Sequence, residues 1–432
     1  MDKRRLSTIF LIVFIDILGF SLILPLVPYY TERYGASDFV TGLLVASYAA
    51  AQLIGAPLLG RLSDQHGRRP ILLVSIGGTV LSFVLFGLAE PVGTWLAGGL
   101  LRDAALANTL IVAVLFISRM LDGLTGGNIS VAQAYITDVT DAQNRARGLG
   151  LVGVAFGLGF ILGPAAGGLL SGLGLYVPAF AGAAVSAINW LMVLFLLPES
   201  LHVGARRNVK LEEILRGRRT FSVAALREAL TRPLVGTLLY ATFFFGLAFA
   251  MLQTVFALYA LRRFELGEQQ TAFILTYVGL LSVIVQGGLI GPLTKRFSEP
   301  VLILVSIGVM ALGLLGWAFA PSVVVLLIVL APIAAAGGVM NVTLRSTITK
   351  AVTQQEYGGI LGLQSSFESL TRVIAPTLGG LLIGWLGTWS PGVFGALLLG
   401  ALLPFVWVRL TKERTVIQAL HEAAPVEAPA GD

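Results

Sequence analysis

The sequence predicts an all-α membrane protein with twelve transmembrane helices in two six-helix bundles. Of its 432 residues, 56% are apolar and only 12% are charged, and the mean hydropathy is +0.87. Apolar stretches of about 18 residues or more recur along the chain, and each is long enough to cross a hydrocarbon core of ~30 Å as a helix. Alternating strand patterning is absent, and lipid offers no partners for exposed backbone groups. We therefore expect helices throughout.

The order of these stretches gives the expected topology. Spans are expected at residues 7–30, 41–60, 70–89, 107–137, 147–172, 176–197, 233–260, 270–292, 299–319, 322–345, 358–386 and 390–410. The expected domains are an N-terminal six-helix bundle (1–200), a cytoplasmic linker (201–232), a C-terminal six-helix bundle (233–411) and a disordered cytoplasmic tail (412–432). The linker is rich in arginine, which favours a short amphipathic helix lying on anionic headgroups.

Two faint internal repeats indicate that the bundles are copies of one unit. The segments 60–62 and 74–77 recur at 291–293 and 305–308, and the segment 163–170 recurs at 375–382. These repeats map the second and third spans onto the eighth and ninth, and the fifth onto the eleventh. They predict a six-helix unit repeated in parallel. Chance matching of glycine- and leucine-rich sequence is the alternative.

Basic residues predict the orientation. Lys3, Arg4 and Arg5 precede the first span, so we expect both termini in the cytoplasm and the chain in the inner (plasma) membrane. The first apolar run is of full span length and lacks a small-residue cleavage site, so no cleavable signal is expected. On this topology most Lys and Arg are cytoplasmic; the exceptions are Arg33, Arg102, Arg262 and Arg263 outside, and Arg119, Arg345 and Arg372 within spans. The net charge of +6 therefore indicates contact with anionic lipid rather than nucleic acid.

Several function classes are disfavoured by composition. The sequence has no cysteine and only three scattered histidines, so neither a metal site nor a thiol nucleophile is expected. No Gly-rich phosphate loop is present, which disfavours pumping driven by ATP. A membrane-embedded enzyme is disfavoured because no Ser-His-Asp arrangement is found. We expect no cofactor.

A charged segment interrupts the apolar sequence between the second and third spans, with its key residues at Gly60, Asp64, Gly67, Arg68 and Arg69. The pattern Gly-x-Leu-x-Asp-x-x-Gly-Arg-Arg resembles the signature of the major facilitator superfamily of transporters at this junction. We call these five residues the latch motif. Its echo at 291–297 lacks the acid and the Gly-Arg-Arg, so the motif belongs to the N-terminal bundle alone. We expect it to hold the outward-open state by gripping neighbouring helices, including the eleventh.

The fifth span contains a glycine motif with a proline, formed by Gly159, Gly163, Pro164, Gly167 and Gly168. It resembles the helix-5 motif of antiporters in the same superfamily, which implies exchange rather than symport or uniport. Glycines at i, i+4 and i+8 form one smooth stripe that lets another helix approach closely, and the proline bends the span. Close packing alone is the alternative explanation.

Three ionisable residues of the N-terminal half are candidates for proton coupling. Asp16 lies near the middle of the first span, in a setting that resembles the first helix of drug/proton antiporters. Arg119 and Asp122 share one face of the fourth span, and their segment resembles the helix-4 motif whose arginine is assigned to proton transfer. Charged groups are costly in lipid and are therefore functional candidates. A structural partner for Asp16 and a static Arg119–Asp122 pair are the alternatives.

The C-terminal half carries its own charges. Glu368 and Arg372 are spaced i, i+4 in the eleventh span, and we expect an ion pair whose role is more structural than functional. Polar side chains that could line a central cavity are Gln52, Asn128, Gln133, Gln253, Gln286, Asn341 and Gln364. Interhelical hydrogen bonding is the alternative for each of them.

The segments 134–140 and 145–147 resemble the tetracycline-efflux branch of the superfamily. The resemblance implies a monomeric secondary transporter that exports a small amphiphilic compound in exchange for protons by alternating access. Spans 3 and 9 lack the carboxylates that some tetracycline exporters are thought to use, so the substrate is open. A proton-coupled metabolite importer and a lipid or lysolipid flippase are the alternative functions on the same fold.

Overall fold

The structure is a computed structural model that describes residues 3–100, 104–141, 144–201, 223–352 and 356–423. The described residues are helical, with no strand among them, and twelve helical stretches are long and apolar enough to cross a membrane. Both findings confirm the predicted fold class. Most of the predicted linker and the last residues of the predicted tail lie outside the described residues.

The first bundle holds the first six spans. It is formed by α1 (Lys3–Ile23), η1 (Leu24–Leu26), α2 (Val27–Arg33), α3 (Asp38–His66), α4 (Arg68–Gly87), α5 (Ala89–Leu100), α6 (Ala104–Thr125), α7 (Asn128–Val139), α8 (Arg145–Ser171) and α9 (Val177–Leu196). The first span includes a 3₁₀ turn, η1, at Pro25, and Pro28 follows in the first turn of α2; neither proline has a backbone N–H to donate. The fourth span is divided between α6 and α7.

The second bundle holds the other six. It is formed by α11 (Val223–Thr231), α12 (Val235–Phe264), α13 (Glu268–Ile284), the π-helix η4 (Val285–Leu289), α14 (Ile290–Arg296), α15 (Glu299–Ala318), α16 (Val323–Lys350), α17 (Tyr357–Leu386) and α18 (Ser390–Ala423). Helix α18 continues to Ala423, into the segment predicted as a disordered tail. That segment contains helix-forming residues and no glycine or proline before Pro425.

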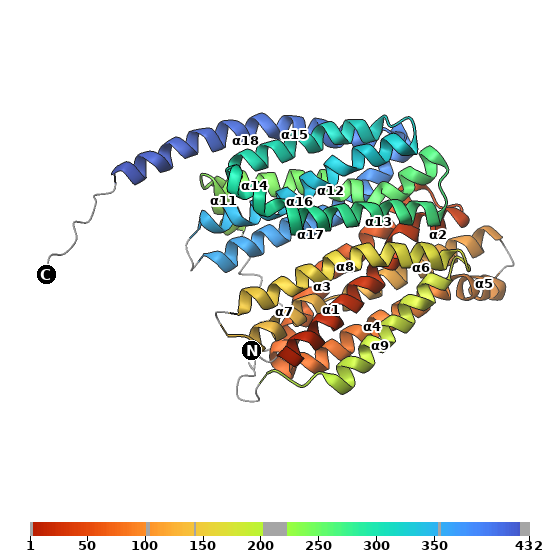
Figure 1. Cartoon of the computed structure of the whole chain (residues 1–432). Coiled ribbons are helices and arrows are strands. Elements are labelled where there is room, and N and C mark those ends of the chain that lie inside the picture. Colours follow the sequence, from red (N-terminus) through yellow and green to blue (C-terminus); the bar gives the residue numbers. More distant parts are fainter. Residues whose placement is uncertain (1–2, 101–103, 142–143, 202–222, 353–355, 424–432) are drawn as a thin grey trace.

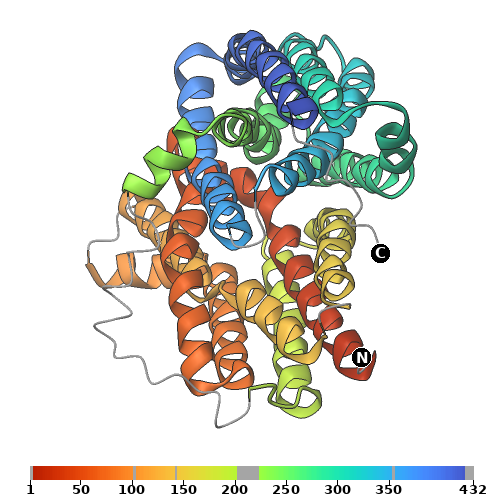
Figure 2. The same ribbon diagram turned by 90° about the vertical axis from the view of Figure 1, so that its left-hand side faces the viewer.

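Each bundle has its own apolar core. Two clusters of buried side chains lie entirely within residues 6–197, and two others lie entirely within residues 229–410. The ribbon shows the same division, with the red-to-yellow-green helices in one group and the green-to-blue helices in the other (Figures 1 and 2). Both termini lie at the same end of the molecule, which we call the termini side; the other end is the opposite side (Figure 1).

The bundles meet along two helix pairs, α3 with α17 and α8 with α13. Gly42 of α3 lies directly against the carbonyl of Pro376, and Gly380 lies against the carbonyl of Asp38. In the other pair, Gly168 faces Ala272. All these contacts lie in the halves of the helices nearest the opposite side, where only a glycine leaves enough room for the facing backbone.

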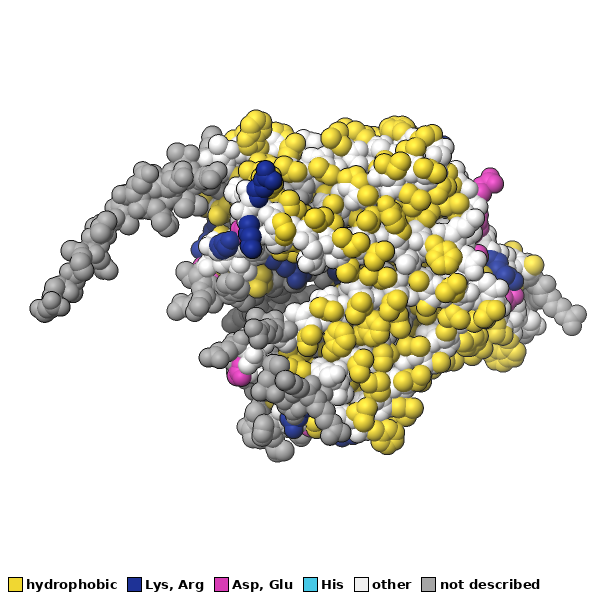
Figure 3. Space-filling view, viewed as in Figure 1, with side chains coloured by type: hydrophobic (Ala, Val, Ile, Leu, Met, Phe, Trp, Pro, Cys, Tyr) yellow, Lys and Arg dark blue, Asp and Glu magenta, His cyan; other side chains and the backbone are white. Residues whose placement is uncertain are grey.

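Polar contacts reinforce the closure at the opposite side. Arg262 of α12 forms ion pairs with Glu32 at 2.8 Å and with Asp38 at 2.9 Å. The hydroxyl of Tyr29 donates to the carbonyl of Leu266 at 2.9 Å and lies 2.6 Å from the hydroxyl of Thr271. We call these six residues the opposite-side gate. At the termini side, in contrast, the surface is hollowed between the two bundles (Figure 3).

The glycine stripe predicted in the fifth span packs against the first span. Gly159 faces Ile17, Gly163 faces the side chain of Ser21, and Gly167 faces the carbonyl of Leu22. The hydroxyl of Ser21 also lies 2.8 Å from the carbonyl oxygen of Gly159, which ties the two helices together. The stripe therefore brings α8 into backbone contact with the helix that carries Asp16.

This packing predicts opposite effects for two substitutions in one helix. Gly163→Ala forces its new methyl group into Ser21 and should destabilise the protein by about 1–3 kcal/mol, a typical cost of overpacking. Gly153→Ala meets nothing within 4 Å and should be neutral or stabilising by up to ~1 kcal/mol, because alanine favours helix. Thermal unfolding of the purified variants measures both. Equal melting temperatures for the two would contradict close packing at Gly163.

Candidate functional site

A helix break divides the fourth span in the middle of the first bundle. Helix α6 ends at Thr125 and α7 begins at Asn128, with two glycines between them. The carbonyls freed by the break find partners in neighbouring helices: Gln52 donates to Gly126 at 2.9 Å, and the hydroxyl of Ser75 donates to Thr125. A broken span is stable in lipid only when its freed backbone groups are bonded in this way.

Small residues let α3 approach the break. Gly55 of α3 lies against the carbonyl of Leu124, and Gly123 of α6 lies against the carbonyl of Tyr48. Gly127 leaves room for Leu59. As a result, the side chain of Gln52 reaches across to the break and is fixed there.

Asp16 and Asn128 meet beside the break. Asp16, on α1, lies at the same small hollow as the side chain of Asn128, the first residue of α7. The surroundings are apolar, with Ile12, Val13 and Ile129 at the same small hollow. Asp16 is partly exposed, whereas Asn128 is buried. The structure therefore places a carboxyl group in an apolar environment beside one buried polar side chain.

Arg119 and Asp122 form an ion pair inside the first bundle. Arg119 Nη2 lies 3.4 Å from Asp122 Oδ2, and both side chains are only 4% exposed. The guanidinium lies 5.3 Å from the ring centre of Phe83 and 5.0 Å from that of Phe86, within the range of cation–π attraction. The two residues are therefore paired in this conformation, and both roles that the sequence left open, a static pair and proton transfer, stay predictions.

Aromatic side chains cluster around Phe20, one helical turn from Asp16. The centre of the Phe20 ring lies 4.7 Å from the centre of the Tyr48 ring and 6.3 Å from the centre of the Phe160 ring. The amide of Gln52 donates to the Tyr48 hydroxyl at 3.1 Å. Three helices, α1, α3 and α8, thus supply an aromatic wall with one polar edge. This combination suits an amphiphilic ligand.

The predicted Glu368–Arg372 pair is wrong. Glu368 pairs instead with Arg345 of the neighbouring helix α16, at 3.3 Å, and it accepts a hydrogen bond from Gln364 at 3.2 Å. An i, i+4 spacing allows an ion pair but does not exclude a partner on an adjacent helix. Arg372 is exposed and lies on the α17 face of Pro376 and Gly380, which packs against α3.

The remaining predicted cavity residues differ in burial. Gln364 and Asn128 are buried, Gln52 is bonded at the break, and the exposed ones are Gln133, Gln253, Gln286 and Asn341. Gln286 lies in the π-helix η4, next to Gly338 of α16. Short π-helical segments inside spans frequently mark functional sites.

The latch motif is helical rather than a loop. Helix α3 continues through Gly60 and Asp64 to His66, and α4 starts at Arg68, so Gly67 alone makes the turn. Its backbone φ is +107° and its ψ is 155°, a conformation that is almost confined to glycine. The corner is tight because one residue reverses the chain.

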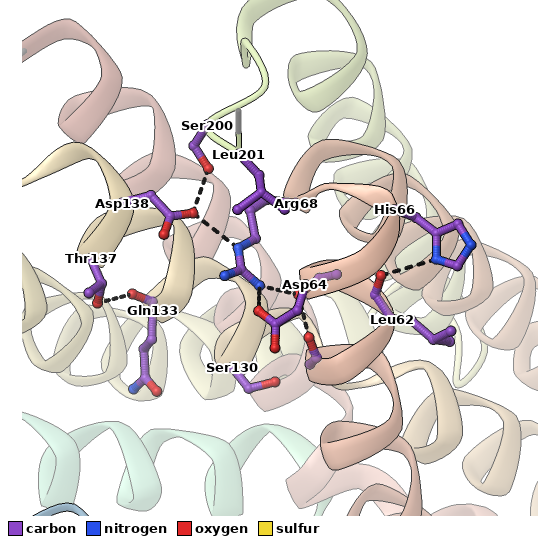
Figure 4. A network of polar contacts seen from close by, with 12 residues as sticks. Leu62, Asp64, His66, Arg68, Ser130, Gln133, Thr137, Asp138, Ser200 and Leu201 are labelled. Carbon is purple, nitrogen blue, oxygen red and sulfur yellow. Dashed lines mark hydrogen bonds and ion pairs between the residues drawn. The ribbon is translucent and has the colours of Figure 1, made fainter. Parts of the chain in front are cut away.

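Arg68 is the centre of the latch motif. Its guanidinium bonds to Asp64 at 2.5 Å, to Asp138 of α7 at 3.0 Å and to the hydroxyl of Ser63 at 2.7 Å (Figure 4). Ser200, after the sixth span, donates to the same carboxylate oxygen of Asp138 at 2.9 Å. The side chain of Arg68 is 8% exposed, and its partner Asp138 is also mostly buried, whereas Asp64 is half-exposed.

Glu199 closes the corner from the other side. Its carboxylate accepts from the backbone N–H of Arg68 at 2.9 Å and of Arg69 at 3.2 Å, which caps the start of α4. Arg69 in turn donates to the carbonyl of Leu194 in the sixth span. The recorded partners of Arg68 and Arg69 thus all lie in the first bundle, and the expected contact with the eleventh span is not among them.

Comparison with known proteins identifies the family. The profile of the Major Facilitator Superfamily matches residues 9–376 and 287–429 in two overlapping segments. The chain belongs to this superfamily. It is 30% identical over 417 residues to the tetracycline resistance protein, class C, of Escherichia coli, covering 92% of this chain and 96% of that one. It is 27% identical over 408 residues to multidrug resistance protein 2 of Bacillus subtilis (strain 168), covering 93% and 95%.

Solved structures share the fold. The human organic anion transporter MFSD10 (TETRAN) superposes with a TM-score of 0.66 at 20% identity, over 94% of this chain and 99% of that one. The nucleoside transporter NupG gives a TM-score of 0.73 at 13% identity, over 94% and 99%. The chain is accordingly a multi-pass membrane protein and a secondary transporter of the major facilitator superfamily, not an enzyme.

Sequence reasoning missed three contributors to this site of the transporter. Glu199 had a signal, because a lone acid directly follows the sixth span. Asp138 stood in a motif that was recognised, but its partnership with Arg68 depends on how α7 packs. Tyr48 gave no signal, because an aromatic residue inside an apolar span has no distinguishing neighbours in the sequence.

The two glycines of the latch motif are predicted to differ. Gly67→Ala should cost about 1–3 kcal/mol, because alanine is strained at this φ and its methyl group would collide with the Glu199 carboxylate. Gly60→Ala should be tolerated, since the nearest atom to the added methyl group is 3.8 Å away. Melting temperature and transport rate, measured side by side, test this. Loss of function in Gly60→Ala alone would show that the turn is not the critical feature.

Proposed function

We propose that this transporter exports a small amphiphilic compound, tetracycline-like in character, in exchange for protons. The observation that carries the proposal is the juxtaposition of Asp16 and Asn128 at the helix break, beside the aromatic wall. Asp16 supplies a group that takes up and releases a proton, and the rings supply an apolar surface for the compound. The resistance proteins of E. coli and B. subtilis support export as the direction.

We place both termini in the cytoplasm and the protein in the inner (plasma) membrane. The bias of Lys and Arg toward the termini side supports this orientation. With this orientation, the hollow at the termini side opens to the cytoplasm, and the opposite-side gate is closed toward the outside. The structure then represents the state that receives its cargo from the cell.

Alternating access follows from the two separate bundles. When the compound binds next to Asp16, the proton leaves, and the bundles rock until the opposite side opens. Helix α8 is suited to transmit the change because its glycine stripe touches α1 on one face and its Gly168 touches α13 of the other bundle. A small shift of α1 is therefore passed to the contact between bundles. Arg119 and Asp122 keep the adjacent charge balanced during the exchange.

The latch motif has a supporting role in this cycle. Arg68, held by Asp64 and Asp138, fixes the corner between α3 and α4 as one rigid piece. When the cytoplasmic ends close in the outward-open state, this corner offers the ends of α3 and α4 to α17. Asp64 is half-exposed here and is available for that contact.

Proton flux in proteoliposomes tests the proposed exchange. Vesicles containing an internal pH dye are exposed to tetracyclines, cationic dyes and metabolites in turn, and a substrate of an antiporter drives protons in the direction opposite to its own movement. A compound that carries protons along with it would establish an importer. Lipid scrambling without any response to soluble compounds would establish a flippase.

Asp16→Asn is predicted to uncouple transport from protons. The amide keeps the size and polarity of the side chain but cannot release a proton at working pH. Transport driven by a pH gradient should fall to the level of protein-free vesicles, and the substrate affinity, which weakens in the wild type as pH falls, should become independent of pH. Glu368→Gln is the matched control because its carboxylate is committed to Arg345. Normal gradient-driven transport in Asp16→Asn would remove Asp16 from the mechanism.

Arg262→Gln is predicted to loosen the opposite-side gate. It removes both ion pairs between the bundles, whereas its neighbour Arg263, which forms no ion pair with the described residues, provides the matched control Arg263→Gln. Because the sequence has no cysteine, spin labels on Arg33→Cys and Val324→Cys report the separation of the bundles at this side without background. The distance distribution should shift toward longer values only in Arg262→Gln. An equal shift in both variants would show that the loss of any positive charge at this side has the effect, and it would contradict a specific role of the Arg262 ion pairs.

A further inference from the structure

A groove on the outside of the second bundle is separate from the transport site. It lies between the beginning of α12, with the end of α11, and the second half of the twelfth span in α18, and its volume is about 550 Å³. Ligand sites in proteins have volumes of roughly 300–1,000 Å³. The residues that matter for its chemistry are Arg232, Tyr240, Phe244, Leu398, Phe405 and Arg409.

The groove runs from the membrane surface into the hydrocarbon. Arg232 precedes the seventh span, and Arg409 lies two residues before the end of the twelfth. From Arg409 to Leu398 the helix descends roughly 16 Å at 1.5 Å per residue, which is about the depth of one leaflet. Trp407, which is 62% exposed, stands at the same level as Arg409, where indole rings favour the interface.

The two ends of the groove differ in chemistry. Its outer end has two guanidinium groups, Arg232 and Arg409, together with the Thr231 side chain. Its inner part is apolar and aromatic, and the rings of Tyr240 and Phe405 meet edge to face with centres 5.8 Å apart. A positively charged head over an apolar trough is the complement of a molecule with an anionic head and a hydrocarbon tail.

The charge at the outer end is only partly balanced. Arg232 pairs with Glu356 at 2.8 Å, and both side chains are more than one third exposed. Arg409 forms no ion pair or hydrogen bond with any residue that the structure describes; its guanidinium lies 5.8 Å from the centre of the Phe405 ring. One positive charge is therefore left over at the mouth of the groove.

We propose that this groove binds an anionic glycerophospholipid from the leaflet on the termini side. The phosphate contacts Arg409 and lies near Arg232, and one acyl chain lies along Tyr240, Phe244 and Leu398. The net negative headgroup matters because Arg409 is unbalanced, and a zwitterionic lipid would add a cation beside it. The acyl chain matters because the trough is apolar, so free phosphate lacks most of the contact. The site does not depend on which compound the protein transports.

Lipid binding to the purified full-length protein tests the proposal. Native mass spectrometry counts the lipid molecules retained, and thermal unfolding measures stabilisation, after addition of phosphatidylglycerol, phosphatidylcholine or inorganic phosphate. Arg409→Gln removes the phosphate contact, and Ala401→Phe fills the trough from an exposed position on its wall. Arg296→Gln is the matched control, because Arg296 is also exposed at the termini side, with its guanidinium 5.9 Å from the ring centre of Phe297, and does not line the groove.

Phosphatidylglycerol should be retained and should raise the melting temperature of the wild type and of Arg296→Gln. In Arg409→Gln its apparent affinity should fall about tenfold, the effect of losing one charge-assisted contact. Ala401→Phe should lose the retained lipid while keeping the wild-type melting temperature without lipid. Equal effects of phosphatidylcholine and phosphatidylglycerol on the wild type would overturn the proposal. So would equal losses in Arg409→Gln and Arg296→Gln, or stabilisation by inorganic phosphate alone.

Discussion

The break between Thr125 and Asn128 is the constraint on which the rest of the first bundle depends. In hydrocarbon a freed backbone carbonyl costs several kcal/mol unless it is bonded. Gln52 and Ser75 supply those bonds from two other helices, and both helices must lie close to do so. The glycines of α3 and α6 at this contact allow the helices to approach closely enough for these bonds. The break also turns the start of α7 toward α1, which brings the Asn128 amide to Asp16.

This arrangement explains why the glycine stripe of the fifth span and the carboxyl group of the first belong to one mechanism. Helix α8 lies close against α1 because its glycines bring no side chain of their own to the contact, which leaves little room to absorb a displacement. Packed interfaces of this kind move as units rather than deforming. A change in the charge of Asp16 that shifts α1 therefore shifts α8, and α8 is one of the helices that touch the second bundle.

The fold was predictable because hydropathy and helix length are properties of each segment by itself. The packing face of the glycine stripe was also predictable, since i, i+4 spacing defines one side of a helix. Partnerships between helices were not. Glu368 was expected to pair with Arg372 within its own helix but bonds to Arg345, and the partner of Arg68 on α7, Asp138, was missed. Such pairs depend on the rotation and depth of neighbouring helices, which a single sequence does not encode locally.

The helical continuation of α3 through the latch motif was hidden for a similar reason, because charged residues inside a helix resemble a loop when hydropathy alone is considered.

The two ends of the molecule use charge in different ways, and the difference in exposure explains why. Arg262 and its partner Glu32 are both more than one third exposed, and exposed ion pairs contribute about 0–1 kcal/mol each. A gate that opens in every transport cycle can stabilise the closed state only weakly. A free-energy difference of a few kcal/mol between the closed and open states already holds nearly all molecules in one of them. Arg68 is almost fully buried, and its partner Asp138 is only 22% exposed, whereas its other partner Asp64 is half-exposed. The Arg68–Asp138 pair is therefore more costly to break during transport than an exposed pair. The latch motif is therefore better understood as a fixed brace that keeps the α3–α4 corner rigid, while the reversible contacts are made by the more exposed side chains around it.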